Sequence, residues 1–381
     1  MAQTVVLDPH EVPNTTTPSP TRRPQPDSRM AATLIDCDVH NYPNSIQDLL
    51  PFLSKRWLAY IEQTGFEGPA AEFLPRFFKL AARRDAWPPT GVIPGADPNF
   101  SRNQLLDAWQ IDYAILNPLY QVNAIRNPDF AIALARAVNE WTANVWLEHD
   151  SRWRGSIVVT PQQPTAAAEE IRRAGQDPRF VQVLLHARSE LPFGQRQFHP
   201  IFKAACDMGL RIGIHFGGPN LNPITAAGWP SYYIEDHTGM TQAFEAQVIS
   251  LVAEGVFERF PTLRVALIEG GFAWLPALMW RFDKNYKGLR DEVPWLTKLP
   301  SDYIRTHFRA SSQPMEEPSD PRHLLQIIEM IGSEDFLMFA TDYPHWDFDS
   351  PDRALPSIVS NNLRQKIMAT TANDFYDFNR A

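Results

Sequence analysis

The chain has 381 residues, of which 44% are hydrophobic and 12% aromatic, a composition that supports a sizeable core and excludes global disorder. Its formal net charge of −9 at pH 7 argues against a nucleic-acid or anionic-membrane partner. The two cysteines, Cys37 and Cys206, are too few for a disulfide framework and fit a reducing cytoplasm.

Residues 1–30 are rich in Pro, Thr, Ser and Arg and have no sustained apolar period, so they are predicted to be a disordered tail. They lack a basic region followed by an apolar one, and we expect no secretory signal. No apolar run approaches the ~18–20 residues that would span a bilayer. Residues 31–381 are predicted to be a single catalytic domain.

Eight short apolar runs, bounded by turn residues or a change to polar sequence, are predicted as strands. They are Leu34–His40, Tyr113–Leu116, Ser156–Val159, Val181–His186, Ile212–Phe216, Val265–Ile268, Phe308–Ser311 and Met338–Thr341. Helical patterns occupy most intervals: Pro128–Glu148, Thr165–Ala174, Pro200–Met208, Thr241–Phe257, Ala273–Leu289, Arg322–Ile331 and Leu363–Tyr376. This alternation predicts an α/β fold, a (β/α)8 TIM-type barrel. A doubly wound open sheet is the alternative, less favoured because the chain lacks a G-x-G-x-x-G turn.

Two long excursions interrupt this alternation. Residues 44–103 follow the first strand and residues 218–238 follow the fifth. Both leave from the C-terminal ends of strands, where the active sites of barrels lie, so they are predicted to be lids or pocket walls.

Metal-ligand residue types end several of the predicted strands. Asp38 and His40 are two residues apart at the end of the first, so their side chains share a face. His215 ends the fifth and Asp342 the eighth. Because ionisable groups are costly to bury, a divalent metal at the converging strand ends is the simplest common reason. Asp342 could also take and return a proton.

Further polar residues extend this set, each with an alternative interpretation. Glu269 ends the sixth strand and could be a ligand, a partner that orients His215, or a substrate contact. His237, in the second excursion, could be a proton shuttle or a surface residue. His186 ends the fourth strand and could bridge to a second metal or bond to substrate.

Three further residues are predicted, like His186, to contact a substrate. Arg188 could pair with a substrate carboxylate, although a solvated arginine is the default interpretation. Tyr233 and His345 would add to a pocket with aromatic walls, although core packing explains aromatic residues equally well. A G-x-S-x-G elbow, a phosphate-binding loop and the C-x-x-C and H-E-x-x-H motifs are all missing, so the site must be assembled from distant strands.

Four segments together resemble the amidohydrolase-related family, in the branch of aminocarboxymuconate semialdehyde decarboxylase and γ-resorcylate decarboxylase. They are Asp36-Cys37-Asp38-Val39-His40, Gly213-Ile214-His215-Phe216-Gly217-Gly218, Ile268-Glu269-Gly270-Gly271-Phe272-Ala273-Trp274-Leu275-Pro276 and Thr341-Asp342-Tyr343-Pro344-His345. The resemblance spans residues 32–377 and implies one divalent ion on a barrel. It matches Asp38 and His40 to the acid-x-His pair, His215 to the fifth-strand ligand and Asp342 to the eighth-strand acid.

Two positions depart from the decarboxylase pattern. Strand six of those enzymes carries a His where this chain has Glu269, and the first-strand acid is Asp38 where γ-resorcylate decarboxylase has Glu. The leading hypothesis is a metal-dependent hydrolase or non-oxidative decarboxylase of a small organic acid, with zinc or manganese. One alternative is a dinuclear iron or manganese oxygenase on the same fold, which would need a second metal. Another is a non-catalytic metal-binding subunit of a hetero-oligomer. The resemblance also implies a homodimer.

Overall fold

Eight parallel strands form one sheet in the order β1 to β8 in this computed structural model, which describes residues 33–69, 74, 78–218 and 222–378. They are β1 (Ile35–Val39), β2 (Tyr113–Leu116), β3 (Trp153–Val158), β4 (Phe180–His186), β5 (Arg211–His215), β6 (Val265–Ile268), β7 (Phe308–Ser311) and β8 (Leu337–Met338). The predicted (β/α)8 barrel is confirmed. The predicted tail, residues 1–30, lies outside the described residues.

The barrel closes through the segment that follows β8. Cys37 donates its backbone N–H to the carbonyl of Phe339 at 2.9 Å, and Asp342 donates to the carbonyl of Asp38 at 3.0 Å. The predicted strand Met338–Thr341 is therefore wrong in extent. Beyond Met338 the chain leaves the ladder with β7 and bonds to β1 instead.

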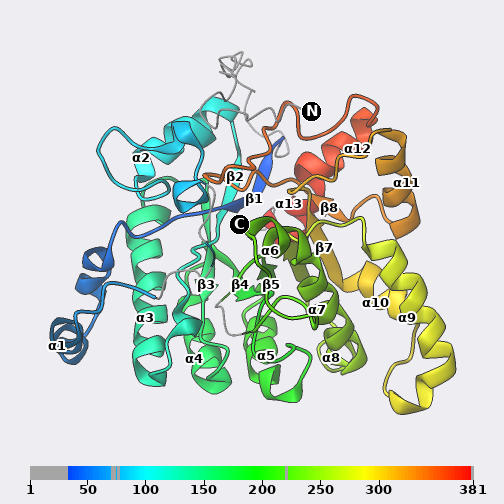
Figure 1. Ribbon diagram of the computed structural model, residues 1–381, viewed down its shortest axis with the longest axis horizontal. Helices are drawn as coiled ribbons and strands as arrows, with labels where there is room; N and C mark the ends of the chain where they lie inside the picture. The colour runs from blue at the N-terminus through cyan, green and yellow to red at the C-terminus, as the bar shows by residue number, and fades with distance from the viewer. Residues whose placement is uncertain (1–32, 70–73, 75–77, 219–221, 379–381) are drawn as a thin grey trace, which may run out of the picture.

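Helices surround the sheet in the intervals between strands (Figure 1). Those that follow strands and pack around the barrel are α3 (Pro128–Trp141), α4 (Pro164–Ala174), α5 (His199–Asp207), α7 (Thr241–Ala253), α8 (Val256–Arg259), α9 (Leu275–Leu289), α10 (Pro300–His307), α11 (Arg322–Ile331), α12 (Asn361–Gln365) and α13 (Thr371–Tyr376). The excursions contain α1 (Lys55–Thr64), α2 (Pro98–Ser101) and α6 (Tyr233–Gly239).

Side-chain caps and local backbone conformation determine where several helices begin, end or are interrupted. The Asn127 side chain accepts from the backbone N–H of Phe130 and caps α3, whose first residue is a proline. The predicted helix Thr241–Phe257 is broken at Gly255, whose φ of +70° lies in the left-handed region that favours glycine. The predicted helix Leu363–Tyr376 is divided by the π-helical turn η9 (Lys366–Thr370).

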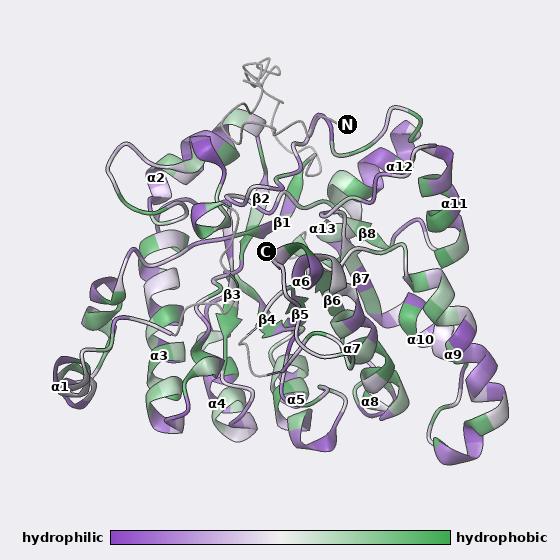
Figure 2. Cartoon of the chain, in the orientation of Figure 1, coloured by the Kyte–Doolittle hydropathy of each residue, from purple (hydrophilic) through white to green (hydrophobic). Residues whose placement is uncertain are grey.

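The core lies between the strands and the surrounding helices. Figure 2 shows mostly hydrophobic strands at the centre, whereas the ends of α5 and α9 away from the barrel are hydrophilic. Fully buried aromatic side chains such as Trp146, Trp153 and Phe308 belong to this core, and burying a large apolar side chain stabilises the fold by about 1.5–3 kcal/mol. Among the described residues, no helix has the length and apolar character needed to cross a membrane.

Candidate metal centre

The four predicted metal ligands lie together at the C-terminal ends of the strands. The nearest carboxylate oxygen of Asp38 lies 3.5 Å from His40 Nε2 and 3.1 Å from His215 Nε2. Asp342 Oδ1 lies 2.7 Å from His40 Nε2. All four side chains are fully buried. Residues as many as 302 positions apart in sequence thus meet here. The ligand atoms of Asp38, His40 and His215 form one group with Glu269, and Asp342 adjoins it through His40.

Backbone carbonyls fix which nitrogen of each imidazole carries a proton. His40 Nδ1 lies 2.8 Å from the carbonyl oxygen of Asn117, and His215 Nδ1 lies 2.9 Å from that of Phe216. A carbonyl only accepts hydrogen bonds, so Nδ1 is the donor in both rings and the neutral ring leaves an Nε2 lone pair. Both Nε2 atoms face carboxylates, which also carry lone pairs. A divalent cation would satisfy all of these atoms, so the donor set fits a metal.

The electrostatics agree with this fit. Burial raises the pKa of Asp342 well above its ordinary value, and the neighbouring carboxylates of Glu269, Asp347 and Asp38 raise it further. Burial also opposes ionisation of Asp38, but His215 and His40 outweigh it and lower the pKa of Asp38. The excess of carboxylates is the environment that a bound cation would neutralise.

Additional side chains offer ligand atoms beside these four. Glu269 Oε2 lies 3.6 Å from His215 Nδ1, and His345 Nδ1 lies 2.8 Å from Asp342 Oδ1. Glu269 also belongs to a separate group with His237 and Asp347, in which the ligand atoms lie within 4.8 Å of one another. Glu269 and Asp342 both have φ near +60°, a conformation that is costly for residues other than glycine and gathers at functional sites.

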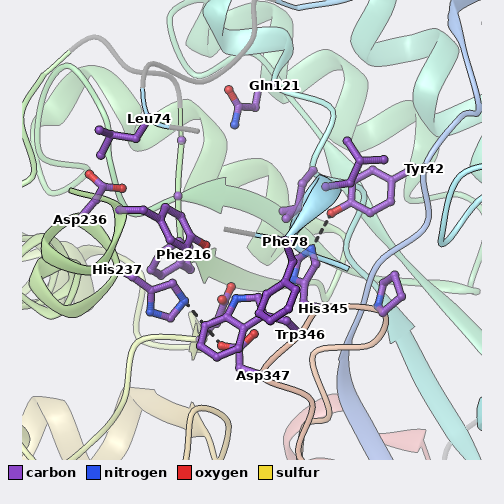
Figure 3. A pocket seen from close by; sticks show the side chains of 18 of the residues that line it. Tyr42, Leu74, Phe78, Gln121, Phe216, Asp236, His237, His345, Trp346 and Asp347 are labelled. Atoms are coloured by element: carbon purple, nitrogen blue, oxygen red, sulfur yellow. Dashed lines mark hydrogen bonds and ion pairs between the residues drawn. The ribbon is translucent and has the colours of Figure 1, made fainter. Parts of the chain in front are cut away.

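A pocket of about 490 Å³ opens above these groups, within the usual size range of small-ligand sites. Tyr42, Phe78, Phe216 and Trp346 give it aromatic walls, and His237 faces Asp347 across one side (Figure 3). Both excursions contribute, the first through Phe78 and its neighbours and the second through α6. Asp38, His40, His215 and Asp342 are not among the lining residues, whereas Glu269 and His345 are. The predicted ligands therefore lie beneath the pocket wall.

The remaining predicted residues line the same pocket. Arg188, which the sequence left open as a solvated residue, is buried, and its Nη2 donates to Asp236 Oδ1 at 2.5 Å. His186 pairs in register with His215, and burial is the main cause that lowers its pKa to about 3. It is therefore a neutral hydrogen-bonding group. The ring of Tyr233 packs edge to face against that of His237, with the two ring centroids 5.6 Å apart.

The residues at the site that were not predicted from the sequence include three with polar side chains. Asp347 lies 3.5 Å from His237, Tyr42 bonds to His345 at 3.1 Å, and Asp236 pairs with Arg188. Each lies within five residues of a predicted one, so a search of the neighbours of each candidate could have found them. Nothing in the sequence distinguishes them from ordinary loop residues.

Comparisons with known proteins agree with this geometry. The family model described as amidohydrolase matches residues 35–378. The gamma-resorcylate decarboxylase of Rhodococcus jostii (strain RHA1) is 25% identical over 297 residues, covering 73% of this chain and 87% of the relative.

Solved structures share the fold. A dihydroxybenzoic acid decarboxylase from Polaromonas sp. JS666, with bound manganese and the inhibitor 2-nitroresorcinol, aligns with a TM-score of 0.65 and 21% identity over 92% of this chain and 98% of that one. A 5-carboxyvanillate decarboxylase from Novosphingobium aromaticivorans, also with manganese, aligns with a TM-score of 0.67 and 19% identity over 91% and 96% of the two chains.

Proposed function

The chain belongs to the amidohydrolase family, and from this premise we propose that it is a manganese-dependent carboxy-lyase that removes carbon dioxide from a small aromatic acid without an oxidant. Decarboxylases of aromatic acids among its relatives support this choice over hydrolysis. The observation that carries the proposal is that Asp38, His40 and His215 bring their ligand atoms together, with Asp342 bonded to His40, beneath a pocket with aromatic walls.

These four side chains would hold the ion, since each presents a nitrogen or oxygen donor and both imidazoles are held in the ligating tautomer. When bound, a divalent ion lowers the pKa of coordinated water or polarises substrate oxygens and stabilises the negative charge that develops on them. Glu269 is close enough to His215 to act as a further ligand or to orient that ring.

The pocket would bind and orient the substrate. The rings of Phe78 and Trp346 stack with centroids 5.9 Å apart, and Phe216 lies near His237 on the other side. Flat apolar walls suit an aromatic ring and exclude water from it. Arg188 lines the pocket, and its guanidinium has the planar set of N–H donors that pairs with a substrate carboxylate or hydroxyl group.

The reaction needs a proton donor at the ring carbon. The carbon–carbon bond to the carboxylate breaks, carbon dioxide leaves, and the electron pair that stays on the ring carbon takes a proton. Glu269 is 5% exposed and lines the pocket, as does His237. We assign proton delivery to these two residues. Asp342, which the sequence suggested as ligand and acid, is fully buried beneath these residues. It could deliver a proton to the substrate only through another residue that lines the pocket.

The test is turnover of a panel of hydroxylated benzoic acids by manganese-loaded protein under nitrogen, with carbon dioxide and the decarboxylated phenol both quantified. Asp342→Asn should abolish turnover without unfolding the barrel. A metal-loaded enzyme that releases no carbon dioxide from any member of the panel would contradict the proposal.

One observation favours a second candidate, a dinuclear oxygenase. His237, Glu269 and Asp347 form a second group of ligand types, which shares Glu269 with the group of Asp38, His40 and His215. Two bound metals per chain, together with oxygen uptake that depends on substrate, would support it. Turnover under nitrogen would exclude it.

We also propose that the enzyme works in the cytoplasm as a homodimer. Its two cysteines are both unpaired, which suits a reducing compartment, and symmetric dimers are the commonest oligomers. Light scattering after size exclusion tests the dimer; a larger complex containing another chain would favour the hetero-oligomer instead.

A further inference from the structure

Buried polar side chains that the proposed chemistry does not use form one connected group around Asn117. Asn117 follows β2 directly, Ser156 lies in β3 and Gln182 in β4, and all three are fully buried. Buried amides and hydroxyls destabilise a fold unless their polar atoms are hydrogen-bonded. The partners of this group therefore indicate what it holds in place.

Asn117 contacts two of the proposed ligands at once. Its Nδ2 donates to Asp38 Oδ1 at 2.8 Å. Its backbone carbonyl oxygen accepts from His40 Nδ1 at 2.8 Å, and its backbone N–H donates to the carbonyl of Val39 at 2.7 Å. One residue thus fixes the carboxylate of Asp38, the tautomer of His40 and the backbone between them.

The orientation of the Asn117 amide is itself determined. An asparagine amide can lie in two orientations that exchange oxygen and nitrogen, and only one donates to Asp38. Asn117 Oδ1 accepts from Ser156 Oγ at 2.6 Å and from Gln182 Nε2 at 2.8 Å. Tyr376, in α13, donates its hydroxyl to Gln182 Oε1 at 2.9 Å and so orients Gln182 in turn. The hydrogen bonds of this series therefore all run toward Asp38: Tyr376 donates to Gln182, Gln182 to Asn117, and Asn117 to Asp38.

The neighbouring strand leaves space for the series. A Cβ atom on Gly213 of β5 would lie 2.8 Å from Gln182 Oε1, closer than two such atoms can approach. Glycine at this position therefore allows the Gln182 amide to reach Asn117. The same strand ends two residues later in His215.

We propose that Asn117 is a positioning residue of the metal centre. Its amide holds the Asp38 carboxylate in the ligating orientation, and its carbonyl holds His40 with Nε2 unprotonated. This inference rests on the proposed ligation by Asp38 and His40. Removing groups that orient metal ligands typically weakens metal affinity by about 10–100-fold.

The experiment titrates Mn²⁺ into metal-free protein and measures the free ion by electron paramagnetic resonance. Asn117→Ala should raise the Kd for Mn²⁺ by about 10–100-fold. Asn139→Ala is the matched control, because Asn139 is also a buried amide and bonds to Val158 and Glu170 instead of the ligands. It should lower Tm to a similar extent and leave the Kd unchanged.

The outcomes separate this inference from the proposed function. Uptake of Mn²⁺ by the wild type with an unchanged Kd in Asn117→Ala would refute the positioning role of the Asn117 amide and leave ligation standing. No uptake by the wild type would refute both. If Asn117→Ala does not fold, Tyr376→Phe removes one oxygen at the far end of the series and should raise the Kd by about 2–5-fold; an unchanged Kd there would overturn the inference.

Discussion

Breaking the buried ion pair between Arg188 and Asp236 is expected to loosen the helix beside the pocket. Asp236 and His237 are consecutive in α6, and Arg188 follows β4, so this contact ties α6 to the barrel. The two side chains are 4% and 12% exposed and their nearest atoms lie 2.5 Å apart. At that distance and an effective dielectric constant of about 20, the attraction is roughly 7 kcal/mol before desolvation is subtracted.

A double-mutant cycle isolates the energy of this pair. Coupling energies of close charge pairs span about 1.5–7 kcal/mol, and we expect ~2–4 kcal/mol here because Asp236 keeps some contact with solvent. Arg188→Met, Asp236→Asn and the double variant would be unfolded in urea, with the free energy of unfolding extrapolated to water. Each single variant should lose about 3 kcal/mol, and the double variant little more than either. Single losses that add to within about 0.5 kcal/mol would refute the reasoning.

Three further predictions concern the ion, the pocket and pH. His215→Ala should lose most bound metal while keeping its barrel, as measured by elemental analysis and circular dichroism; full metal content would contradict ligation. Trp346→Ala should raise KM for an aromatic substrate by roughly 5–20-fold through lost apolar contact, with unchanged metal content. An unchanged KM would show that the substrate ring does not bind against Trp346. Burial raises the pKa of Asp349 to about 6, so its folded state binds a proton more tightly than its unfolded state. Stability from this group is present below about pH 4 and is lost as pH rises through 6, by at most about 3 kcal/mol. Asp349→Asn should flatten the pH dependence of urea unfolding over that range, and an identical profile would show that Asp349 does not cause it.

The barrel could be predicted because its strands are buried on both faces. Continuous apolar runs such as Val265–Ile268 stand out from the helical patterns around them, and the predicted bounds of that strand and of the helix Arg322–Ile331 agree with the structure. The helix α10 was not predicted, since its eight residues include few apolar positions in a helical period. The site residues at the strand ends could be predicted for the same reason, because each of them stands where one of these apolar runs ends.

Contacts between side chains could not be predicted in this way. The tautomer of His40 depends on the carbonyl of Asn117, a residue that the sequence indicates only as the turn after a strand. The placement of Asp347 opposite His237 depends on the short helix α6 and on the loop after β8, neither of which was predicted from a periodic pattern. Local sequence therefore indicates which residues are available at the mouth of the barrel, and tertiary contacts determine which of them meet.

Closure of the barrel and placement of the ligands depend on the same hydrogen bonds. Asp342 donates its N–H to the carbonyl of Asp38, and His40 donates its N–H to the carbonyl of Tyr343 at 2.7 Å. The ladder that joins the first strand to the last thus fixes the distance between the first-strand and eighth-strand ligands. Asp342 adopts its left-handed backbone within this ladder, and a residue would keep that costly conformation only where surrounding contacts enforce it. It follows that a substitution that weakens closure, such as Thr341→Val, which removes a 2.6 Å bond to Asp36, should weaken metal binding together with stability.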